Sequence, residues 1–169
     1  MWLVIFAVIL VVSGATVEAA DIPQYIHDAY EACNDRTGEV QRCRSLAEQG
    51  NPAASYDLAE MYDKGKGFPQ DHQEALKWFR LAAQNGAPSA QFNLGTMYLN
   101  GVGVPQNLVL AHMWFNIAVT SAERYDFVPG AVQAKELRDF VGARITATQL
   151  QKAQETARRC YETKFKECG

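Results

Sequence analysis

The fold is decided by residues 54–86, ASYDLAEMYDKGKGFPQDHQEALKWFRLAAQNG, because their landmarks return 36 residues later in residues 90–122, AQFNLGTMYLNGVGVPQNLVLAHMWFNIAVTSA. Twelve residues are identical in this register. Ala54, Leu58, Met61, Tyr62, Gly65, Gly67, Pro69, Gln70, Ala75, Trp78, Phe79 and Ala82 recur as Ala90, Leu94, Met97, Tyr98, Gly101, Gly103, Pro105, Gln106, Ala111, Trp114, Phe115 and Ala118. A fixed period of this size is the signature of a stacked repeat, in which each unit buries its face on the next.

Each unit is predicted to contain two helices. Apolar stripes at helical spacing are formed by Ala54, Leu58, Met61 and Tyr62 in the first helix and by Ala75, Trp78, Phe79 and Ala82 in the second. Gly65 and Gly67 are expected to end the first helix, because glycine accepts the left-handed conformation found at helix ends. Asp71 and Glu74 have capping-box spacing, which predicts that the second helix starts there. Asn107 takes the capping role in the second unit.

The pattern Ala-x3-Leu-Gly-x2-Tyr-x2-Gly-x-Gly-Val, followed by Ala-x2-Trp-Phe-x2-Ala, resembles the Sel-one-like repeat (SLR), a relative of the tetratricopeptide repeat. The second unit matches at Ala90, Leu94, Gly95, Tyr98, Gly101, Gly103, Val104, Ala111, Trp114, Phe115 and Ala118. The first unit has Ala59 and Phe68 at the positions of Gly95 and Val104. The resemblance implies an all-α, right-handed α-solenoid of antiparallel helix hairpins, which usually works as an adaptor or scaffold for other proteins.

The sequence on either side of the repeats is expected to form atypical end units, which keep the ends of a solenoid soluble. We divide the chain into a degenerate unit over residues 20–52, repeats over residues 53–88 and 89–122, and C-terminal capping helices with a tail over residues 129–169. Residues 46–54 echo residues 82–90, which predicts a helix over residues 39–49.

Two helices are predicted in the C-terminal flank. Pro129 is well placed as the first residue of a helix. The apolar positions of that helix are Val132, Leu137, Phe140, Val141 and Ile145. Thr146 and Gln149 have capping-box spacing, so a further helix is predicted over residues 147–160. The pair resembles the capping hairpin that follows the last repeat in many bacterial SLR proteins.

Residues 1–19 are predicted to be a signal peptide. Residues 2–12 form an unbroken apolar run, and Val17-Glu18-Ala19 fits the small-x-small cleavage rule. No Lys or Arg precedes the run, so an uncleaved membrane anchor remains an alternative, although the run is shorter than the about 20 residues that span a bilayer. We therefore expect a periplasmic or secreted protein with no stable membrane span after cleavage.

The four cysteines, Cys33, Cys43, Cys160 and Cys168, are expected to form disulfides, because an even number in an oxidising compartment favours pairing. Three connectivities are possible. We favour Cys33 with Cys43 and Cys160 with Cys168, since each pair brackets a short segment that can bend back on itself. All four lie outside the two repeats, so the bonds would clamp the ends of the fold.

The sequence shows no catalytic, cofactor-binding or metal-binding constellation. His27, His72 and His112 stand apart from one another and from any His-Glu-x-x-His pattern, and no Gly-x-Ser-x-Gly is present. His72 is expected to be solvated and His112 to be packed. A net charge of −3 argues against a nucleic-acid partner, which would require a basic face. We therefore predict a protein that is not an enzyme.

One enzymatic alternative is kept, because some cysteine-rich SLR proteins are regarded as penicillin-binding or β-lactamase-like. In those proteins the cysteine pairs usually occur inside each repeat, which is not the case in this sequence. The carboxylates Asp57, Glu60 and Asp63 could form an acid/base set. A solvated helix face is the favoured interpretation, because nothing nearby in the sequence is expected to desolvate one of them and raise its pKa.

The predicted binding surface is the concave side of the solenoid, which the first helix of each unit lines in tetratricopeptide-like folds. Its non-packing positions are Asp57, Glu60 and Lys64 in the first unit and Asn93, Thr96 and Asn100 in the second. We expect this surface to hold an extended or helical peptide, with the acids preferring a basic segment and the amides bonding its backbone. The alternative is a set of merely hydrated polar residues. The protein is expected to be a monomer.

Overall fold

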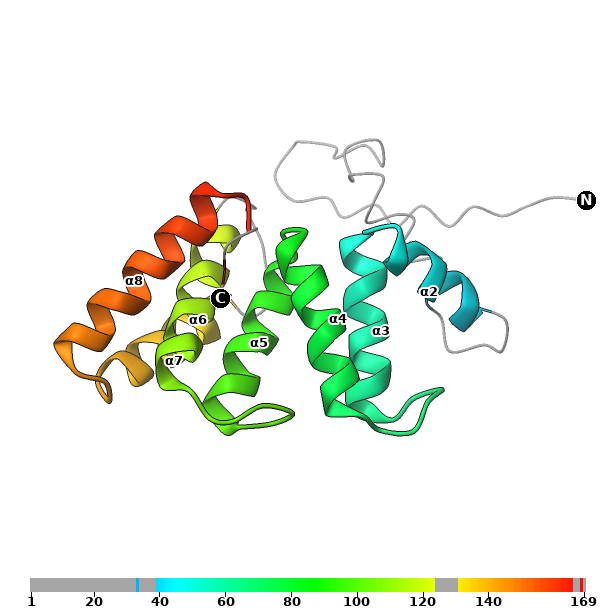
Figure 1. Ribbon diagram of the computed structural model, residues 1–169, viewed down its shortest axis with the longest axis horizontal. Coiled ribbons are helices and arrows are strands. Elements are labelled where there is room, and N and C mark those ends of the chain that lie inside the picture. Colours follow the sequence, from blue (N-terminus) through cyan, green and yellow to red (C-terminus); the bar gives the residue numbers. More distant parts are fainter. Residues whose placement is uncertain (1–32, 34–38, 124–130, 166–167, 169) are drawn as a thin grey trace, which may run out of the picture.

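The computed structural model describes residue 33, residues 39–123, residues 131–165 and residue 168 (Figure 1). The described helices are α2 (Glu39–Glu48), α3 (Pro52–Lys64), α4 (His72–Gln84), α5 (Pro88–Asn100), α6 (Leu108–Ala122), α7 (Ala131–Gly142) and α8 (Ala147–Glu162). From α2 to α6, each helix packs on the one that follows it in the chain. The predicted all-α solenoid of helix hairpins is confirmed, and no strand occurs within the described ranges.

The two repeats end their first helices in the same way. Gly65 and Gly101 adopt left-handed φ angles of 68° and 70°, and their N–H groups donate to the carbonyls of Met61 and Met97. A residue with a Cβ would be strained in this conformation. The glycines of the motif therefore fix the turn between the two helices of each hairpin.

Asp71 begins α4 as predicted, since its carboxylate accepts hydrogen bonds from the backbone N–H groups of Gln73 and Glu74. The other half of the predicted capping box is wrong. The carboxylate of Glu74 instead forms an ion pair with Lys77, three residues further along the same helix. An exposed ammonium group in the next turn therefore competes successfully for this carboxylate.

The caps of α6 and α8 are confirmed. The side chain of Asn107 accepts from the backbone N–H of Leu110. At the start of α8, Thr146 and Gln149 cap each other reciprocally, each side chain accepting from the other's backbone N–H. These short polar side chains satisfy N–H groups that have no partner within the helix itself.

Matched aromatic pairs fill the core of the two hairpins. Phe79 and Phe115 are fully buried, and each lies against an aromatic residue of the first helix of its own unit. The ring centroids of Tyr56 and Phe79 are 5.7 Å apart, and those of Phe92 and Phe115 are 5.8 Å apart. The sequence period is therefore reproduced as a period in packing.

A second matched contact joins successive units. The guanidinium of Arg44 in α2 donates to the hydroxyl of Tyr62 in α3 at 2.6 Å, and Arg80 in α4 donates to Tyr98 in α5 at 2.5 Å. The two pairs are 36 residues apart in the sequence. Each pair ties the second helix of one unit to the first helix of the next.

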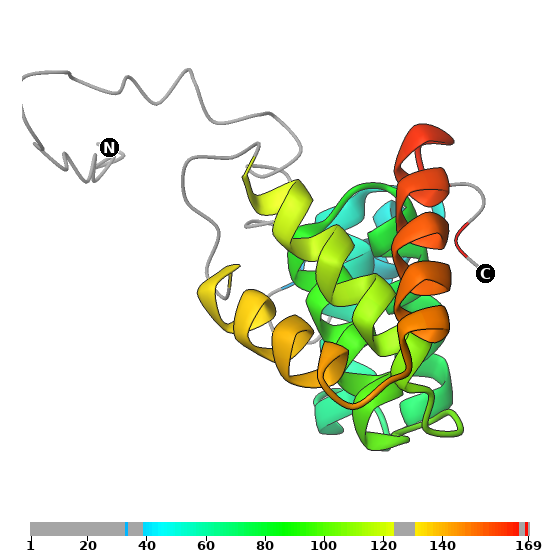
Figure 2. The same ribbon diagram turned by 90° about the vertical axis from the view of Figure 1, so that its left-hand side faces the viewer.

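The stacking pattern changes at the C-terminal end. Helices α7 and α8 both pack on α6, whereas they make few contacts with each other. Figure 2 shows α7 and α8 diverging from their connection, with α6 between them. The predicted pair of capping helices is present, but its members lie on different sides of α6 rather than forming a tight hairpin.

Several predicted apolar positions of α7 are not in the core. Val132 and Phe140 are 74% and 46% exposed, and the helix ends at Gly142, before Ile145. Its buried residues are Ala134 and Val141. Since α7 packs chiefly on α6, only a narrow stripe of its surface is covered.

Both favoured disulfides are present. Cys33 is bonded to Cys43, and Cys160 is bonded to Cys168, with Cα–Cα distances of 5.0 and 4.7 Å. Cys43 lies in α2 and Cys160 in α8, so the bonds anchor segments at the two ends of the described solenoid. Such cross-links stabilise a fold mainly by restricting the unfolded chain.

Several predictions fall outside the described residues. They are the signal peptide over residues 1–19, most of the degenerate unit before residue 39, and the helix start at Pro129. The domain division therefore stays a prediction, although α2 occupies the predicted range 39–49 with a helix over Glu39–Glu48. None of the described helices has both the length and the apolar character that crossing a membrane requires.

The packing of Gly95 generates a testable prediction. A Cβ atom at this position would lie 2.6 Å from the ring of Phe115, which is fully buried. We expect Gly95→Ala to lower the free energy of unfolding by about 1–3 kcal/mol through overpacking, even though alanine is the better helix former. Urea unfolding monitored by circular dichroism measures this change.

Thr96→Ala is the matched control, because Thr96 neighbours Gly95 on the same helix and is half-buried. This change should leave stability within about 0.5 kcal/mol of the wild type. If Gly95→Ala were as stable as Thr96→Ala, the close contact with Phe115 would not constrain the repeat.

Candidate functional site

The six residues predicted to bind a partner lie on the first helices of the two repeats. They are Asp57, Glu60 and Lys64 on α3 and Asn93, Thr96 and Asn100 on α5. Within each set the spacing is i, i+3, i+7, so the side chains share one side of the helix. Lys64 and Asn100 are exposed, and the other four are half-buried.

Tyr56 connects the two sets. Its hydroxyl donates to Oε1 of Glu60 at 3.1 Å and lies within hydrogen-bonding reach of the Asn93 side chain. Burial, together with the negative charge of Glu60, raises the pKa of Tyr56 well above its ordinary range, so the hydroxyl remains a donor. The sequence interpretation missed Tyr56. The sequence did contain a signal for it. The equivalent residue of the second repeat is Phe92, so the hydroxyl of Tyr56 is a polar group that the packing of the repeat does not require.

Asp57 overturns the expectation that no carboxylate of this helix is desolvated. Burial, and secondarily the charge of Glu60, raises the pKa of Asp57 to about 6. Burial disfavours the charged form of a carboxyl group, and a neighbouring carboxylate disfavours it further. Asp57 is therefore about half ionised near pH 6 and approaches its full negative charge only at higher pH.

The remaining predicted residues do not contact Tyr56 in the interactions that the structure shows. Lys64 pairs with Glu60 at 2.7 Å on the same helix, and the hydroxyl of Thr96 donates to the carbonyl of Phe92 at 3.2 Å. Asn100 is the last residue of α5. The structure thus gathers Glu60 and Asn93 around Tyr56, with Asp57 beside Glu60, while Thr96 and Asn100 are outside this cluster.

The histidines were only partly predicted. Nδ1 of His72 lies 2.9 Å from Oδ1 of Asp63, so His72 is paired with a carboxylate and is not simply solvated as expected. His112 is buried, as predicted. Among the residues that the structure describes, no group of three His, Cys, Asp or Glu side chains is arranged to hold a metal ion.

The arrangement suits recognition by hydrogen bonds and charge. Glu60 and Asp57 offer carboxylate oxygens, and Asn93 offers both a donor and acceptors. Because these groups are half-buried, their interactions are less screened than those on a fully exposed face. A ligand with positive charge and peptide-like polar groups would be complementary to this surface.

Comparison with known proteins agrees with this architecture. The family model described as Sel1 repeat matches residues 52–86 and 88–121. The crystal structure of c5321, described as a protective antigen of uropathogenic Escherichia coli strains with an SLR fold, is 32% identical with a TM-score of 0.67. That match covers 77% of this chain and 26% of the other, so the chain spans about a quarter of the length of c5321.

The chain contains two Sel1 repeats.

A Sel1 repeat protein from Oxalobacter formigenes is 27% identical over 69% of this chain and 98% of the other, with a TM-score of 0.46. No curated protein matches the chain. The two matched segments coincide with the two hairpins: the first contains α3 and α4, and the second contains α5 and nearly all of α6. In this Sel1-repeat protein, the half-buried polar cluster therefore lies on the first helices of both repeats.

The raised pKa of Asp57 predicts a pH-dependent stability for Asp57→Asn. The folded-state pKa of about 6 lies above the ordinary value of 3.8, so the wild type gives up stability as the pH rises between these values. At about pH 7.5 we expect the free energy of unfolding of Asp57→Asn to exceed that of the wild type by about 1–2 kcal/mol. This figure allows for the partial exposure of Asp57 to solvent. The gain should disappear near pH 4, where the wild-type carboxyl is protonated in the folded protein.

Urea unfolding at both pH values measures this difference. Glu48→Gln is a suitable control, because Glu48 is exposed at the end of α2 and its change should give no comparable dependence on pH. A pH-independent effect of Asp57→Asn would contradict the desolvation of Asp57.

Proposed function

We propose that this Sel1-repeat protein is an exported, non-catalytic adaptor or scaffold that binds a peptide segment of another protein on the polar surface of α3 and α5. The family match supports protein binding, because stacked helical repeats present extended surfaces to their partners. The observation that carries the proposal is the cluster of Tyr56, Glu60, Asp57 and Asn93, which spans both repeats.

The proposed ligand is a basic, extended or helical segment. Asp57 and Glu60 are adjacent carboxylates, and their mutual repulsion is part of what raises the pKa of Asp57. A lysine or arginine side chain placed between them would relieve this repulsion. Asn93 and Asn100 would then bond the ligand backbone, since a side-chain amide matches both the N–H and the C=O of a peptide.

The proposed location is the periplasm or the exterior of the cell. All four cysteines are paired, which fits an oxidising compartment. The apolar run over residues 2–12 supplies an export signal, with retention as a membrane anchor as the alternative. Mass spectrometry of the native N-terminus distinguishes the two, because a cleaved protein would begin at Ala20. We further propose that the protein is a monomer.

The binding surface is tested with short charged peptides. We expect fluorescently labelled hexalysine to bind the protein at about pH 7.5, and hexaglutamate to bind at least about tenfold more weakly, because opposite charges attract and like charges repel. The combined change Asp57→Asn, Glu60→Gln, Asn93→Ala and Asn100→Ala should weaken hexalysine binding by about tenfold or more. Fluorescence anisotropy at low ionic strength measures both quantities.

The matched control is Glu155→Gln with Glu162→Gln, which also removes two carboxylates but does so on α8. It should leave binding of hexalysine within about twofold of the wild type, as expected for charges far from the ligand. Equal loss in both variants would indicate only a general effect of net charge and would refute the surface on α3 and α5.

A further inference from the structure

A polar cavity is lined by residues of α6, α7 and α8. Figure 2 shows how α7 and α8 diverge on either side of α6. Its volume is about 360 Å³. The lining residues are His112, Asn116, Arg138, Asp139, Gly142, Leu150 and Gln154. A second hollow of about 330 Å³ adjoins it between α6 and α8 and shares Asn116 and Gln154. Together the two hollows form a trough along α6, and this trough shares no residue with the surface on α3 and α5.

The trough lies along α6, the helix that has no arginine at the position of Arg44 and Arg80. Position 116 follows Arg44 and Arg80 in the 36-residue register, but it is occupied by the shorter Asn116. In addition, α7 turns away from α8, and its buried Ala134 packs in a cluster with Val119 and Phe92. The space that an arginine would fill is therefore left open to a ligand.

The floor of the trough is a polar stripe on an otherwise apolar helix. His112, Asn116 and Thr120 are spaced i, i+4, i+8 on α6 and lie on one side of it. Within the described part of the chain, no hydrogen bond engages the side-chain amides of Asn116 or Gln154. Two amides facing one channel provide donors and acceptors for an extended peptide backbone.

The end of the trough that α7 lines carries a guanidinium with N–H donors that none of the described residues occupies. Arg138 has a side chain that is only 23% exposed, and its Nε and Nη2 both contact Oδ1 of Asp139 at 2.9 Å. A guanidinium has five N–H donors, so about three remain for a ligand. Asp139 is 60% exposed, and water therefore screens much of its charge.

The pKa of His112 depends on the charged groups that line this cavity. Burial first, and then the positive charge of Arg138, lowers the pKa of His112, while Asp139 opposes this effect more weakly. The imidazole is therefore neutral at physiological pH. At the position of His112 the charge of Arg138 outweighs that of Asp139, which favours an anionic ligand group beside Arg138.

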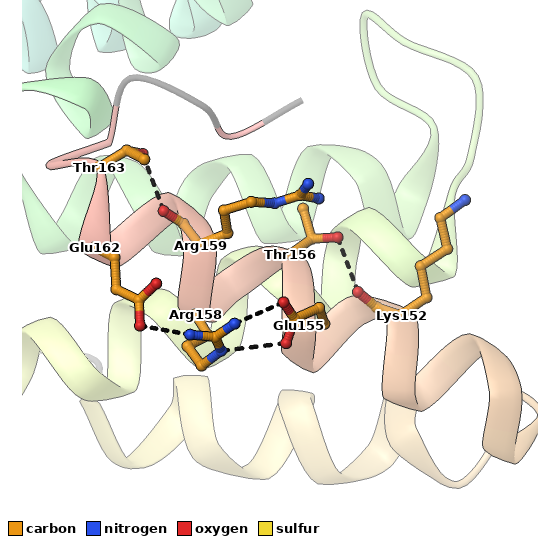
Figure 3. Close-up of polar contacts among 7 residues, drawn as sticks. All are labelled: Lys152, Glu155, Thr156, Arg158, Arg159, Glu162 and Thr163. Atoms are coloured by element: carbon orange, nitrogen blue, oxygen red, sulfur yellow. Dashed lines mark hydrogen bonds and ion pairs between the residues drawn. The ribbon is translucent and has the colours of Figure 1, made fainter.

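The other end of the trough, which Arg158 and Glu162 line, has no comparable unsatisfied charge in the described part of the chain. Figure 3 shows Arg158 held between Glu155 and Glu162 on α8. Its guanidinium donates to both oxygens of Glu155, at 3.1 and 2.7 Å, and to Glu162 at 2.6 Å. The two carboxylates together outweigh the single positive charge of Arg158. An anionic group would accordingly be attracted to Arg138 at the other end of the trough.

Arg138 lies near the end of α7, shortly before the α7–α8 connection that follows Gly142. A Cβ at Gly142 would lie 3.4 Å from Cδ2 of His112, so α6 and the end of α7 pack closely beside Arg138. A carboxylate bound to Arg138 would therefore sit at this end of the trough. From His112 to Thr120 the helix rises about 12 Å, which matches about three or four extended residues.

We propose that this trough binds the C-terminal carboxylate of a peptide, with the carboxylate on Arg138 and the preceding residues running past Asn116 and Gln154. A free carboxylate accepts two parallel N–H bonds from a guanidinium, which gives both affinity and orientation. The site is a second recognition surface beyond the one proposed on α3 and α5.

N-acetyl-trialanine with a free C-terminus is the probe, and titration of the isotopically labelled full chain by NMR is the measurement. We expect saturable shifts of the Arg138 Nε–H and of the side-chain amides of Asn116 and Gln154. The C-terminal amide of the same peptide should bind at least about tenfold more weakly, because the charge-assisted hydrogen bonds are lost. Acetate and an amidated peptide with an internal aspartate are tested in parallel.

Arg138→Gln should weaken binding of the free-carboxylate peptide by about tenfold or more, and Gln154→Ala should also weaken it at an exposed helical position where alanine is well tolerated. Arg159→Gln is the matched control, because Arg159 lies on α8 but does not line either hollow. Hexalysine binding should be unchanged in Arg138→Gln, which separates this site from the surface on α3 and α5.

Four results would overturn the proposal. Binding of acetate as tight as that of the peptide would reduce the site to an ion site only. Binding of the internal-aspartate peptide as tight as that of the free C-terminus would show that a chain end is not required. Equal binding of the amidated peptide, or full binding by Arg138→Gln, would remove the role of the carboxylate.

Discussion

The structure depends on one constraint, which is that no helix hairpin of this chain can cover its own apolar face. Phe79 and Phe115 are buried only because the helices of their own hairpin and those of its neighbours enclose them. Trp78 and Trp114 likewise belong to one continuous core. Since each hairpin is stable only in the presence of the next, the period of the sequence becomes a period in space.

The repeat made most of the fold predictable. Glycines at fixed positions, aromatic residues at helical spacing and polar caps such as Asp71 each act over a few residues, so their effect can be predicted from local sequence. The C-terminal end was harder to predict. Val132 and Phe140 have the spacing of core residues, but whether a helix face is buried depends on which neighbours cover it. Beyond the last repeat, the sequence no longer indicates which elements cover a given helix face.

The candidate site was predictable as a surface but not as a chemical environment. Spacing alone placed Asp57 and Glu60 on one side of α3. The pKa of Asp57 also depends on burial, which arises from tertiary packing and leaves no pattern within a single helix. Tyr56 was missed for a related reason, because its bond to Glu60 follows an ordinary i, i+4 spacing and its approach to Asn93 involves a different helix.

Identical repeats would present identical surfaces, so specificity in a solenoid must come from positions where the units differ. The first repeat carries Tyr56, Asp57 and Glu60 where the second carries Phe92, Asn93 and Thr96. The same reasoning applies along the second helices, where the residue after Arg44 and Arg80 in the register is Asn116. Arg44 and Arg80 each donate a hydrogen bond to a tyrosine of the next unit. Asn116 makes no such bond to any residue that the structure describes and instead lines a cavity. Departures from the repeat therefore leave polar groups available for partners, while adherence to it uses them to hold the units together.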